Sequence, residues 1–515
     1  MLAKLFSSAV IGVDAYKIDV EVDVAPGLPV FNIVGLPETS VRESKERVKS
    51  AIKNSGYSFP MDRITVNLAP ADIKKDGTGF DLPIAIGLLA ATGVIPPDLF
   101  KIHLLLGELS LDGAVKPVRG ALPAAILCKN KAYSGIIVPA VNGAEASVVQ
   151  DISVFPVSHL SEVVDFLRGM NPITPLKTDI GELFNQTVSE TLDFADVAGQ
   201  EHVKRAIEIA VAGFHNILMI GPPGSGKTML ARRIPSIMPP MTVDEAMDTT
   251  KIFSVSGKLG KSEALITRRP FRSPHHTISD AGLIGGGHAP RPGEVSLAHN
   301  GVLFLDEFPE FRKNVLEALR QPLEDHQVTI ARAAMSISYP SSFMLVGAMN
   351  PCPCGFFLDT HKECVCTPFQ ISKYRSKLSG PLLDRIDIHV EVPSVPHSTL
   401  MKRSMEESSQ EIRKRVTASR EIQLKRFHRS KTVANGRMST RQITLFCQLD
   451  PPSQSLLISA MERLGLSARA YNRILKLSRT IADMDGRAEI APEHLSEAIQ
   501  YRCLDRGMGG MAPLS

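Results

Sequence analysis

Gly221 to Thr228 read GPPGSGKT, and this glycine-rich stretch lies between the apolar run NILMI and a segment with helical periodicity. Between a strand and a helix, such glycines allow backbone N–H groups to close around phosphate oxygens at the positive end of the helix. Lys227 would reach the outer phosphates and Thr228 would bind Mg²⁺. A nucleoside triphosphate is therefore predicted to bind to Gly221, Pro222, Pro223, Gly224, Ser225, Gly226, Lys227 and Thr228.

Further polar residues follow buried strands downstream of this turn. The strand in GVLFLDEF ends at Asp306 and Glu307, and the strand in SSFMLVGAMN ends at Asn350. Ligands bind at the carboxyl ends of the strands in open α/β sheets. Asp306 would hold Mg²⁺ through water, Glu307 would polarise the attacking water, and Asn350 would orient it. Arg385, on a turn in SGPLLDRIDIHVEV, would supply charge to a transferring phosphoryl group.

The length and composition set the expected organisation of the chain. With 515 residues it should hold two to four domains, because one hydrophobic core rarely grows past about 250 to 300 residues. A net charge of +4 is compatible with nucleic acid and does not require it. The apolar stretches are too short to cross a membrane, and the amino terminus is a weak match to a secretory signal. We therefore expect a cytoplasmic protein.

The order of strand and helix patterns predicts an α/β fold with several parts. YKIDVEVDV, from Tyr16, alternates apolar and charged residues, which indicates a half-buried strand in a mixed α/β unit. Strands and helices alternate from about Asp193 to about Val392, which predicts a parallel sheet with helices on both faces. The predicted ranges are an amino-terminal domain over 1–175, a linker over 176–192, a nucleotide-binding core over 193–395, a helical linker over 396–438 and a helical lid over 439–515.

The charged helix within the predicted helical linker, residues 403–429, has two interpretations. It is a nucleic-acid surface, or it is a solvated linker helix whose basic residues have acidic partners.

Four of the seven cysteines lie within fifteen residues, in CPCGFFLDTHKECVC. Such clustering in a cytoplasmic chain favours a metal over disulfides. Four thiolates around one Zn²⁺ would close a structural site, although the spacing is tighter than usual. Unliganded, oxidisable thiols and an iron–sulfur cluster are the alternatives. The predicted zinc ligands are Cys352, Cys354, Cys364 and Cys366.

The nucleotide motifs together resemble those of the AAA+ ATPases. GEVSLAHNGVLFLDEF, AMNPCPCG, SGPLLDRIDIHVEVP and SARAYNRILKLSRTIADM are similar to the magnesium-chelatase-like YifB/ComM family. The resemblance implies ATP as the nucleotide, a homo-hexameric ring and an Arg385 that reaches the ATP of a neighbouring subunit. It implies that Arg469 is the second sensor, with Arg473 and Arg479 as competitors and an ordinary surface arginine as the alternative. It also implies that residues 268–293 point at the central pore. The arginines and histidines of that segment suit phosphate contacts, and a structural loop is the alternative. The resemblance also implies branched or single-stranded DNA as a partner.

The amino-terminal part resembles the Lon protease domain, a ribosomal S5 domain 2-like fold. KDGTGFDLP, from Lys75, corresponds to the turn that carries the Lon serine, and GELSLDGAVKPVRGALPAA to the stretch that carries its lysine. Here the serine position is Gly79 and the lysine position is Leu122, so both halves of the catalytic dyad are missing. Thr78 remains as a candidate for a rearranged nucleophile. We expect an inactive protease-like scaffold or a surface for DNA.

These patterns predict an ATP-driven ring motor that acts on recombining DNA, in branch migration or as a helicase. The alternatives are a metal-insertion chaperone like the magnesium chelatase motor, an ATP-dependent protease, and a regulator that binds ATP without hydrolysing it.

Overall fold

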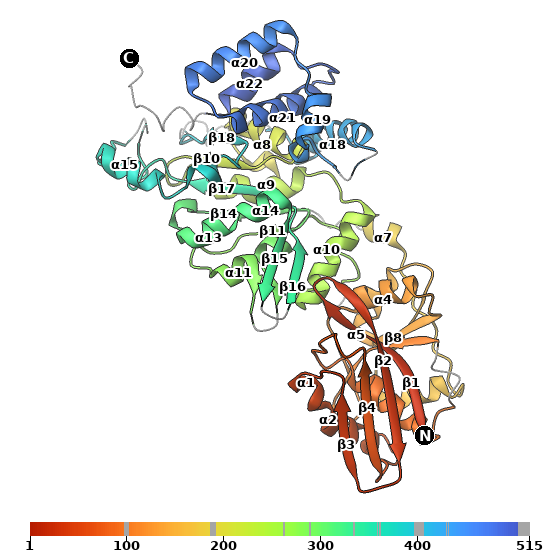
Figure 1. The fold of residues 1–515 in the computed structure, drawn as a ribbon. Coiled ribbons are helices and arrows are strands. Elements are labelled where there is room, and N and C mark those ends of the chain that lie inside the picture. The colour runs from red at the N-terminus through yellow and green to blue at the C-terminus, as the bar shows by residue number, and fades with distance from the viewer. Residues whose placement is uncertain are drawn as a thin grey trace. The chain divides into compact units, whose positions relative to one another are not determined.

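The computed structural model describes residues 1–96, 102–185, 192–260, 263–287, 290–332, 335–357, 359, 362–395, 406–428, 430 and 432–502. Contacts divide the chain into two compact units (Figure 1). The first comprises Met1–Thr187 and Thr242–Thr267, and the second Val188–Met241 and Arg268–Ser515. Parts of both predicted linkers, residues 186–191 and 396–405, lie outside the described residues.

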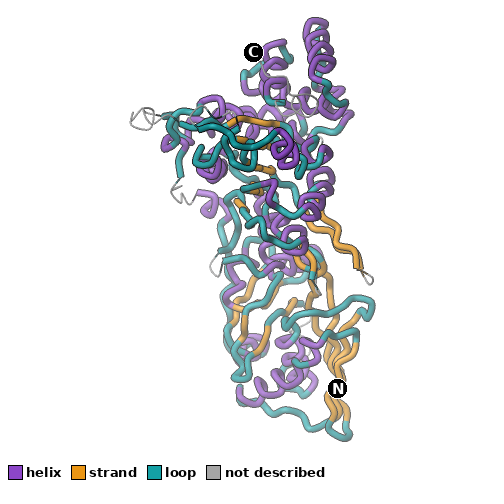
Figure 2. The backbone as a smooth tube through the Cα atoms, turned by 90° about the vertical axis from the view of Figure 1, so that its left-hand side faces the viewer, coloured by secondary structure: helices purple, strands orange, loops and turns teal. Residues whose placement is uncertain are grey.

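The amino-terminal unit is built on a seven-stranded sheet with the order β3-β4-β2-β1-β5-β8-β9. β2 pairs antiparallel with both β1 and β4, whereas the other neighbours in this sheet pair in parallel. Figure 2 shows helices beside the strands of this unit. The strands are β1 (Leu2–Ile11), β2 (Asp14–Ala25), β3 (Val30–Val34), β4 (Arg63–Ala69), β5 (His103–Leu105), β8 (Gly135–Pro139) and β9 (Ser153–Val157), and a small ribbon joins β6 (Glu108–Leu109) to β7 (Val115–Lys116).

The alternation in β2 produces one buried and one polar face. Ile18, Val20 and Val22 are fully buried, whereas Tyr16 at the start of the pattern is exposed. Helix α3 (Asp81–Ala91) packs against the buried face, and every residue of α3 is buried. A Cβ at Gly87 would lie 2.6 Å from Val22 Cγ2, so the helix approaches the sheet closely only because this residue is glycine. The predicted half-buried strand is present.

The remaining helices of this unit are α1 (Thr39–Arg42), α2 (Ser44–Asn54), α4 (Ala121–Asn130), α5 (Ala140–Ser147), α6 (Leu160–Leu167), α7 (Ile180–Asn185) and α10 (Val243–Ser256). Helix α10 follows the nucleotide-binding segment in sequence, yet it packs on α4 of the amino-terminal unit. Residues 242–267 therefore pack outside the unit that holds the rest of the predicted range 193–395.

The second unit is built on a five-stranded parallel sheet with the order β11-β14-β17-β10-β18. The P-loop strand β10 lies between β17 and β18. This arrangement confirms the predicted α/β class with a parallel core sheet. The strands are β10 (Ile217–Ile220), β11 (Phe271–Arg272), β14 (Val302–Leu305), β17 (Met344–Met349) and β18 (Ile388–Glu391), and two hairpins pair β12 (Gly285–Gly286) with β13 (Arg291–Pro292) and β15 (Gln327–Arg332) with β16 (Met335–Pro340).

Helices and short 3₁₀ turns complete this unit. They are η1 (Phe194–Asp196), α8 (Glu201–Gly213), α9 (Lys227–Ile237), α11 (Asp280–Ile284), α12 (Glu294–Leu297), η2 (Phe308–Glu310), α13 (Lys313–Ala318), α14 (Arg320–Asp325), α15 (Pro368–Arg375), α16 (Gly380–Leu383), α18 (Ser409–Arg426), η3 (Asn435–Arg437), α19 (Thr440–Phe446), α20 (Pro451–Leu464), α21 (Ala468–Met484) and α22 (Pro492–Gln500). Near the carboxyl-terminal end of the unit, α18 packs on α8 and α9, and α21 packs on α8.

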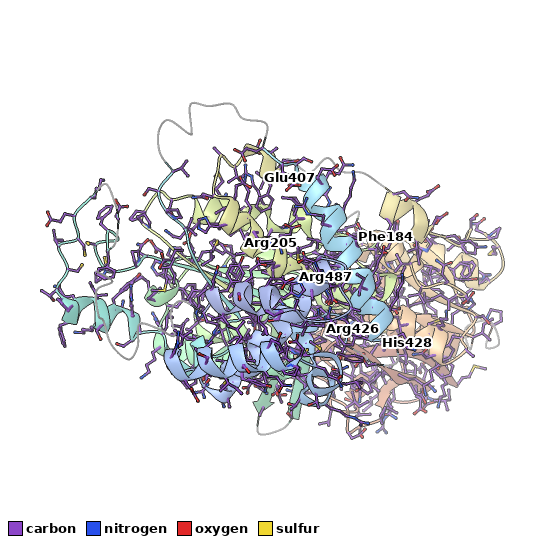
Figure 3. The ribbon with its side chains drawn as sticks, turned by 90° about the horizontal axis from the view of Figure 1, so that it is seen from above. Phe184, Arg205, Glu407, Arg426, His428 and Arg487 are labelled. Atoms are coloured by element: carbon purple, nitrogen blue, oxygen red, sulfur yellow. The ribbon has the colours of Figure 1, made fainter. Side chains whose placement is uncertain are left out.

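Helix α18 contains most of the described part of the charged segment, and several of its basic side chains have partners within this unit. Arg415 lies 2.6 Å from Glu208 of α8 and also pairs with Glu407, and Arg426 pairs with Asp483. Arg420 donates to the last carbonyl groups of α8. Figure 3 shows Glu407 and Arg426 at opposite ends of α18. These contacts favour the interpretation of a linker helix with acidic partners.

Across the described ranges, none of the helices combines the length and the apolar character that crossing a membrane requires.

Candidate active site

The turn GPPGSGKT connects β10 to α9 in the geometry that the sequence predicts. Gly224 and Gly226 have φ angles of 78° and 89°, a region in which side chains are strained. A Cβ at Gly221 would lie 2.1 Å from the carbonyl oxygen of Val392. The turn therefore requires glycine at these positions for its own fold, apart from any ligand.

Lys227 is the first residue of α9, and its side chain is folded back over the turn. Its Nζ donates to the carbonyl oxygens of Gly221 at 2.7 Å and Pro222 at 2.8 Å. It also lies 3.4 Å from Oδ1 of Asn350. Burial lowers the pKa of Lys227 to about 8, although the nearby carboxylate of Asp306 opposes this shift. Phosphate oxygens would replace these carbonyl groups as acceptors and favour the charged ammonium.

The two residues predicted to bind magnesium are in direct contact. Thr228 Oγ1 donates to Asp306 Oδ2 at 2.6 Å. Asp306 directly follows β14, and its other oxygen accepts from the backbone N–H of Glu307 at 2.9 Å. A hydroxyl oxygen and a carboxylate oxygen that lie side by side are hard ligands of the kind that Mg²⁺ prefers beside phosphates.

Glu307 adopts an unusual backbone conformation for a residue with a side chain. Its φ is 50°, and its side chain is 60% exposed. One of its carboxylate oxygens lies 3.1 Å from Nδ1 of His276. The sequence indicated that the histidines of the segment 268–293 could contact phosphates, but it did not predict this partner. The adjacent histidines His275 and His276, in the segment before the strand that ends at Asp306, were the sequence feature that could have suggested a partner for Glu307.

Asn350 joins this group through the sheet topology. It follows β17, the parallel neighbour of β10, so both strands end beside the P-loop. The structure thus brings together Lys227, Thr228, Asp306 and Asn350, with Glu307 next to Asp306.

Arg385 and Arg469 lie close to each other, and their partners are outside the P-loop. The Arg385 side chain is 6% exposed and donates to the carboxylate of Glu324 and to the carbonyl of Pro381. Arg469 is 62% exposed and lies 3.4 Å from the carboxylate of Asp384, the residue before Arg385.

The two arginines that compete with Arg469 have structural partners. Arg473 pairs with Asp387, a buried carboxylate that also accepts from the backbone N–H of Asn216 at 2.9 Å. Arg479 is buried and lies 3.0 Å from Asp483, and it donates to two backbone carbonyls near the end of α21. Of the three arginines, Arg469 has the most exposed side chain.

The four clustered cysteines converge on one point in the second unit. Their sulfur atoms all lie within 4.8 Å of one another. The Sγ of Cys352 lies 3.4 Å from that of Cys354 and 3.7 Å from that of Cys364. Four sulfurs placed tetrahedrally at about 2.3 Å from one Zn²⁺ are separated by about 3.8 Å, so this donor set fits the ion.

The cysteine loop also contacts the P-loop. A Cβ at Gly355 would lie 2.6 Å from Cδ of Pro223, so the loop rests directly on the nucleotide-binding turn. The backbone N–H of Gly355 donates to Cys352 Sγ at 3.2 Å, and that of Cys354 donates to Cys366 Sγ at 3.4 Å. A backbone N–H from Phe356 lowers the pKa of Cys354, whereas desolvation and hydrogen bonds to Cys354 and Cys352 raise the pKa of Cys364 and Cys366.

The turn that resembles the Lon serine loop has internal partners for its polar side chains. Thr78 donates to the carboxylate of Glu108, and buried Lys75 donates to the carbonyl of Pro70. Asp81 is fully buried and accepts two hydrogen bonds from Arg47, at 2.6 and 3.0 Å. Its pKa is nevertheless raised to about 6, because burial outweighs the effect of Arg47.

The positions of the missing dyad are apolar. A Cβ at Gly79 would meet a methyl group of Val118 at 3.6 Å, and the side chain of Leu122 is fully buried. Neither position offers a hydroxyl or an amine.

Family models match the chain in three places. The model described as magnesium chelatase, subunit ChlI, matches residues 193–400. Models of subunit ChlI of Mg-chelatase and of the ChlI C-terminal part match residues 20–142 and 406–502.

Individual relatives match over almost the whole chain. Competence protein ComM of Haemophilus influenzae is 45% identical over 509 residues, which cover 98% of each chain. A protein called YifB from Escherichia coli is 44% identical over 509 residues, again with 98% of each chain covered. The 67 kDa magnesium-chelatase subunit of Heliobacterium mobile is 24% identical over 345 residues, or 60% of this chain and 47% of that protein.

Proposed function

Because the chain belongs to the YifB/ComM family of magnesium-chelatase-like AAA+ ATPases, we propose that it hydrolyses ATP as a homo-hexameric ring in the cytoplasm and uses that energy to move the branch point of recombining DNA. The observation that carries the hydrolysis step is the contact of Thr228 with Asp306 beside Lys227 and Asn350. The DNA substrate is supported by the similarity to a protein named for competence.

Each residue of the candidate site has a distinct role in this proposal. Lys227 and the backbone N–H groups of the P-loop would hold the phosphates. Thr228 and Asp306 would hold Mg²⁺, which would supply positive charge to the phosphate oxygens. Glu307 accepts a proton from the attacking water, and Asn350 orients that water.

The positions of Arg385 and Arg469 support a site completed by a second subunit. Both arginines have partners outside the P-loop of their own chain, and Arg469 lies next to the residue before Arg385. We propose that both are presented together to the ATP of a neighbouring subunit, where they stabilise the charge on the transferring phosphoryl group. Arg385 must leave Glu324 to do so.

We also propose that Cys352, Cys354, Cys364 and Cys366 hold one structural Zn²⁺. The sulfur spacing and the backbone donors to the sulfurs support this ion. Because Gly355 contacts Pro223, the metal would stiffen the loop that rests on the P-loop. Elemental analysis of purified protein should give about one zinc per chain. A fully folded, metal-free sample would refute this part of the proposal.

A metal-insertion ATPase is the second candidate, because the matching family models describe a magnesium-chelatase subunit. The two candidates differ in the response of hydrolysis to DNA.

The test measures ATP hydrolysis and strand exchange on a synthetic four-way junction and on a forked duplex, with linear duplex as the comparison. Lys227→Ala and Glu307→Gln are the controls that should be inactive. Hydrolysis stimulated by branched DNA, together with ATP-dependent conversion of the junction, supports the proposal. Hydrolysis that is indifferent to every DNA would favour the metal-insertion candidate.

A further inference from the structure

Asn216 directly precedes the P-loop strand β10, and its buried side chain holds the turn that carries Arg385. Its amide nitrogen donates to the main-chain carbonyl oxygen of Arg385 at 2.9 Å. Its amide oxygen accepts from the backbone N–H of Leu345 in β17, also at 2.9 Å. A carbonyl acceptor on one side and an N–H donor on the other fix which way the amide points. The main chain at Arg385 is thereby tied to the sheet.

The backbone of Asn216 also contacts the residues that follow Arg385. Its carbonyl oxygen accepts from the N–H groups of Asp387 and Ile388, both at 3.0 Å. Its own N–H donates to Oδ2 of Asp387 at 2.9 Å. Asn216 thus makes four hydrogen bonds to residues 385–388. Because β18 begins at Ile388, these bonds fix the arginine turn at the point where it enters the sheet.

Helix α21 contacts the same turn through two arginines that are one helical turn apart. Arg473 pairs with the buried carboxylate of Asp387, and Arg469 lies 3.4 Å from the carboxylate of Asp384. Residues four apart lie on one face of a helix. One face of α21 therefore contacts the residue before Arg385 and the residue two places after it. The pair at Asp384 is the more exposed of the two, so water screens it more strongly.

Asp387 keeps its negative charge although it is buried. Desolvation would raise the pKa of Asp387, but the charge of Arg473 and the contact with His215 outweigh it and hold that pKa well below its usual value. The ionised carboxylate is what binds Arg473, so a neutral side chain at this position would release α21 from the turn.

The guanidinium of Arg385 has fewer partners than the main chain of the turn that carries it. It donates to the carboxylate of Glu324, whose side chain is 54% exposed, and to the carbonyl of Pro381. Its buried Nε has no hydrogen-bond partner among the residues that the structure describes. The guanidinium can therefore exchange Glu324 for another anion while the hydrogen bonds of Asn216 keep the main chain in place.

We propose that Asn216 and Asp387 are positioning residues for Arg385, and that they fix the origin of its side chain so that the guanidinium reaches the ATP of a neighbouring subunit. The inference rests on the proposed function, which assigns Arg385 to that ATP. It adds that Asn216, which precedes the P-loop of its own subunit, exerts its effect at the nucleotide of the next subunit.

The physical basis is the geometry that charge stabilisation needs. A guanidinium stabilises a transferring phosphoryl group only when its nitrogen atoms lie within hydrogen-bonding distance of the phosphate oxygens. A displacement of about 1 Å is enough to slow a reaction about a hundredfold. Because the arginine side chain is long, a small tilt of the main chain at Arg385 moves the guanidinium by more than the main chain itself moves. The hydrogen bonds of Asn216 oppose such a tilt.

The first experiment measures kcat and the KM for ATP for the wild type, Asn216→Ala, Arg385→Ala and the double variant. The proposal predicts that Asn216→Ala lowers kcat by about tenfold or more and leaves the KM unchanged. The double variant should be no slower than Arg385→Ala. A wild-type kcat in Asn216→Ala would overturn the proposal. So would losses that multiply in the double variant, since they would show that Asn216 acts independently of Arg385.

The second experiment mixes subunits, because a positioning residue for Arg385 acts on the neighbouring site. Lys227→Ala subunits have an inactive P-loop and an intact arginine turn, whereas Asn216→Ala subunits have the reverse. Rings that contain both should hydrolyse ATP faster than either variant alone. A mixture of Arg385→Ala with Lys227→Ala is the reference for this gain.

The reference mixture separates the inference from the proposed function. If it gains activity and the mixture with Asn216→Ala does not, Asn216 serves its own P-loop and the inference fails. If the reference mixture gains nothing, the proposed action of Arg385 across subunits fails. The double variant then still tests whether Asn216 acts through Arg385.

Asn435→Ala is the matched control for the loss of a buried asparagine. It removes hydrogen bonds to Asp483 at 2.7 Å and to Thr480 at 3.2 Å, and Asp483 retains Arg426 and Arg479 as partners. This control should keep most of the wild-type kcat. A loss equal to that of Asn216→Ala would attribute both effects to general destabilisation and would contradict the proposal.

Asp387→Asn is a second variant of the same turn, for the case in which Asn216→Ala does not fold. Asparagine keeps the shape of the side chain and an acceptor for the N–H of Asn216, and it removes the charge that holds Arg473. It should lower kcat, leave the KM for ATP unchanged and regain activity when mixed with Lys227→Ala. A wild-type kcat in Asp387→Asn would show that the ion pair with Arg473 does not position the arginine.

Discussion

The chain contains two glycine-containing turns that each lead into a buried helix, and only one of them retains side chains suited to catalysis. In the P-loop, Lys227 donates to carbonyls of its own turn, and Thr228 contacts Asp306. In the turn before α3, Lys75 donates to the carbonyl of Pro70, and Thr78 donates to the carboxylate of Glu108.

The two turns differ in whether a ligand could offer their polar side chains better partners than the protein groups they now contact. A triphosphate with Mg²⁺ supplies better partners for Lys227 and Thr228 than the ones they have, because it brings charged oxygens and a metal. The serine position of the other turn is Gly79 and the lysine position is buried Leu122, so a peptide would find neither half of a dyad there. The side chains of each turn, and not the glycines that both turns contain, therefore decide which chemistry the turn can support.

Substituting Lys227 and Lys75 is the strongest test of this comparison. Lys227→Ala should lower the rate of ATP hydrolysis by at least about a hundredfold, because a charge aimed at the phosphates is lost. Lys75→Ala is the matched variant at the other turn, and we expect its hydrolysis rate to stay close to that of the wild type. Phosphate release by the two purified variants measures this difference, and equal losses in both would contradict the comparison.

Removing Arg47 tests whether the turn before α3 is a structural element. Arg47→Leu leaves Asp81 buried without its ion-pair partner, which should destabilise the amino-terminal unit by about 3 kcal/mol at neutral pH. Burial already raises the pKa of Asp81 to about 6, and the variant raises it further. A raised pKa in the folded state means that stability is greatest at acid pH and is lost as the pH rises through that pKa.

Hydrogen exchange of α3 at about pH 5 and pH 7 measures this effect, with rates corrected for the intrinsic pH dependence of exchange. Lys129→Leu is the control, because its ion pair with Asp151 is exposed and should contribute less than about 1 kcal/mol. Equal effects of the two substitutions would show that the buried pair has no special role.

The pH dependence of nucleotide binding tests whether Lys227 of the P-loop gains a proton when phosphates bind. Lys227 has a pKa lowered to about 8 without ligand, and phosphates should raise it. Binding then takes up a proton above about pH 8, so the affinity for Mg·ATP should fall by up to about tenfold per pH unit there. Titration calorimetry in two buffers with different ionisation enthalpies detects this proton. A constant affinity across this range would mean that Lys227 is already fully charged.

The smallest change in activity is expected when only the serine of the dyad is restored. Gly79→Ser places a Cβ at ordinary contact distance from Val118, so the fold should tolerate it. We expect no hydrolysis of casein or of peptides, with or without ATP, because Leu122 supplies no base. ATP-dependent cleavage by the wild type that disappears in Thr78→Ala would instead show that Thr78 acts as a nucleophile.

Local patterns in the sequence predicted the parts of the molecule that depend on local chemistry. The P-loop needs its glycines and its Lys-Thr pair within eight residues, and Asp306 and Glu307 directly follow an apolar strand. Contacts between distant residues were not predicted. The packing of α10 on α4, the pairing of Arg385 with Glu324 and the contact of His276 with Glu307 depend on tertiary structure, which periodicity and spacing do not record.

The most direct test of the central claim is the steady-state release of phosphate from Mg·ATP by purified protein in the presence of a four-way DNA junction, for the wild type and for Glu307→Gln. We predict turnover that requires Mg²⁺ and falls by about two orders of magnitude or more in the variant, while ATP is still bound. A wild-type protein that binds ATP and never hydrolyses it, or a variant as active as the wild type, would contradict the account.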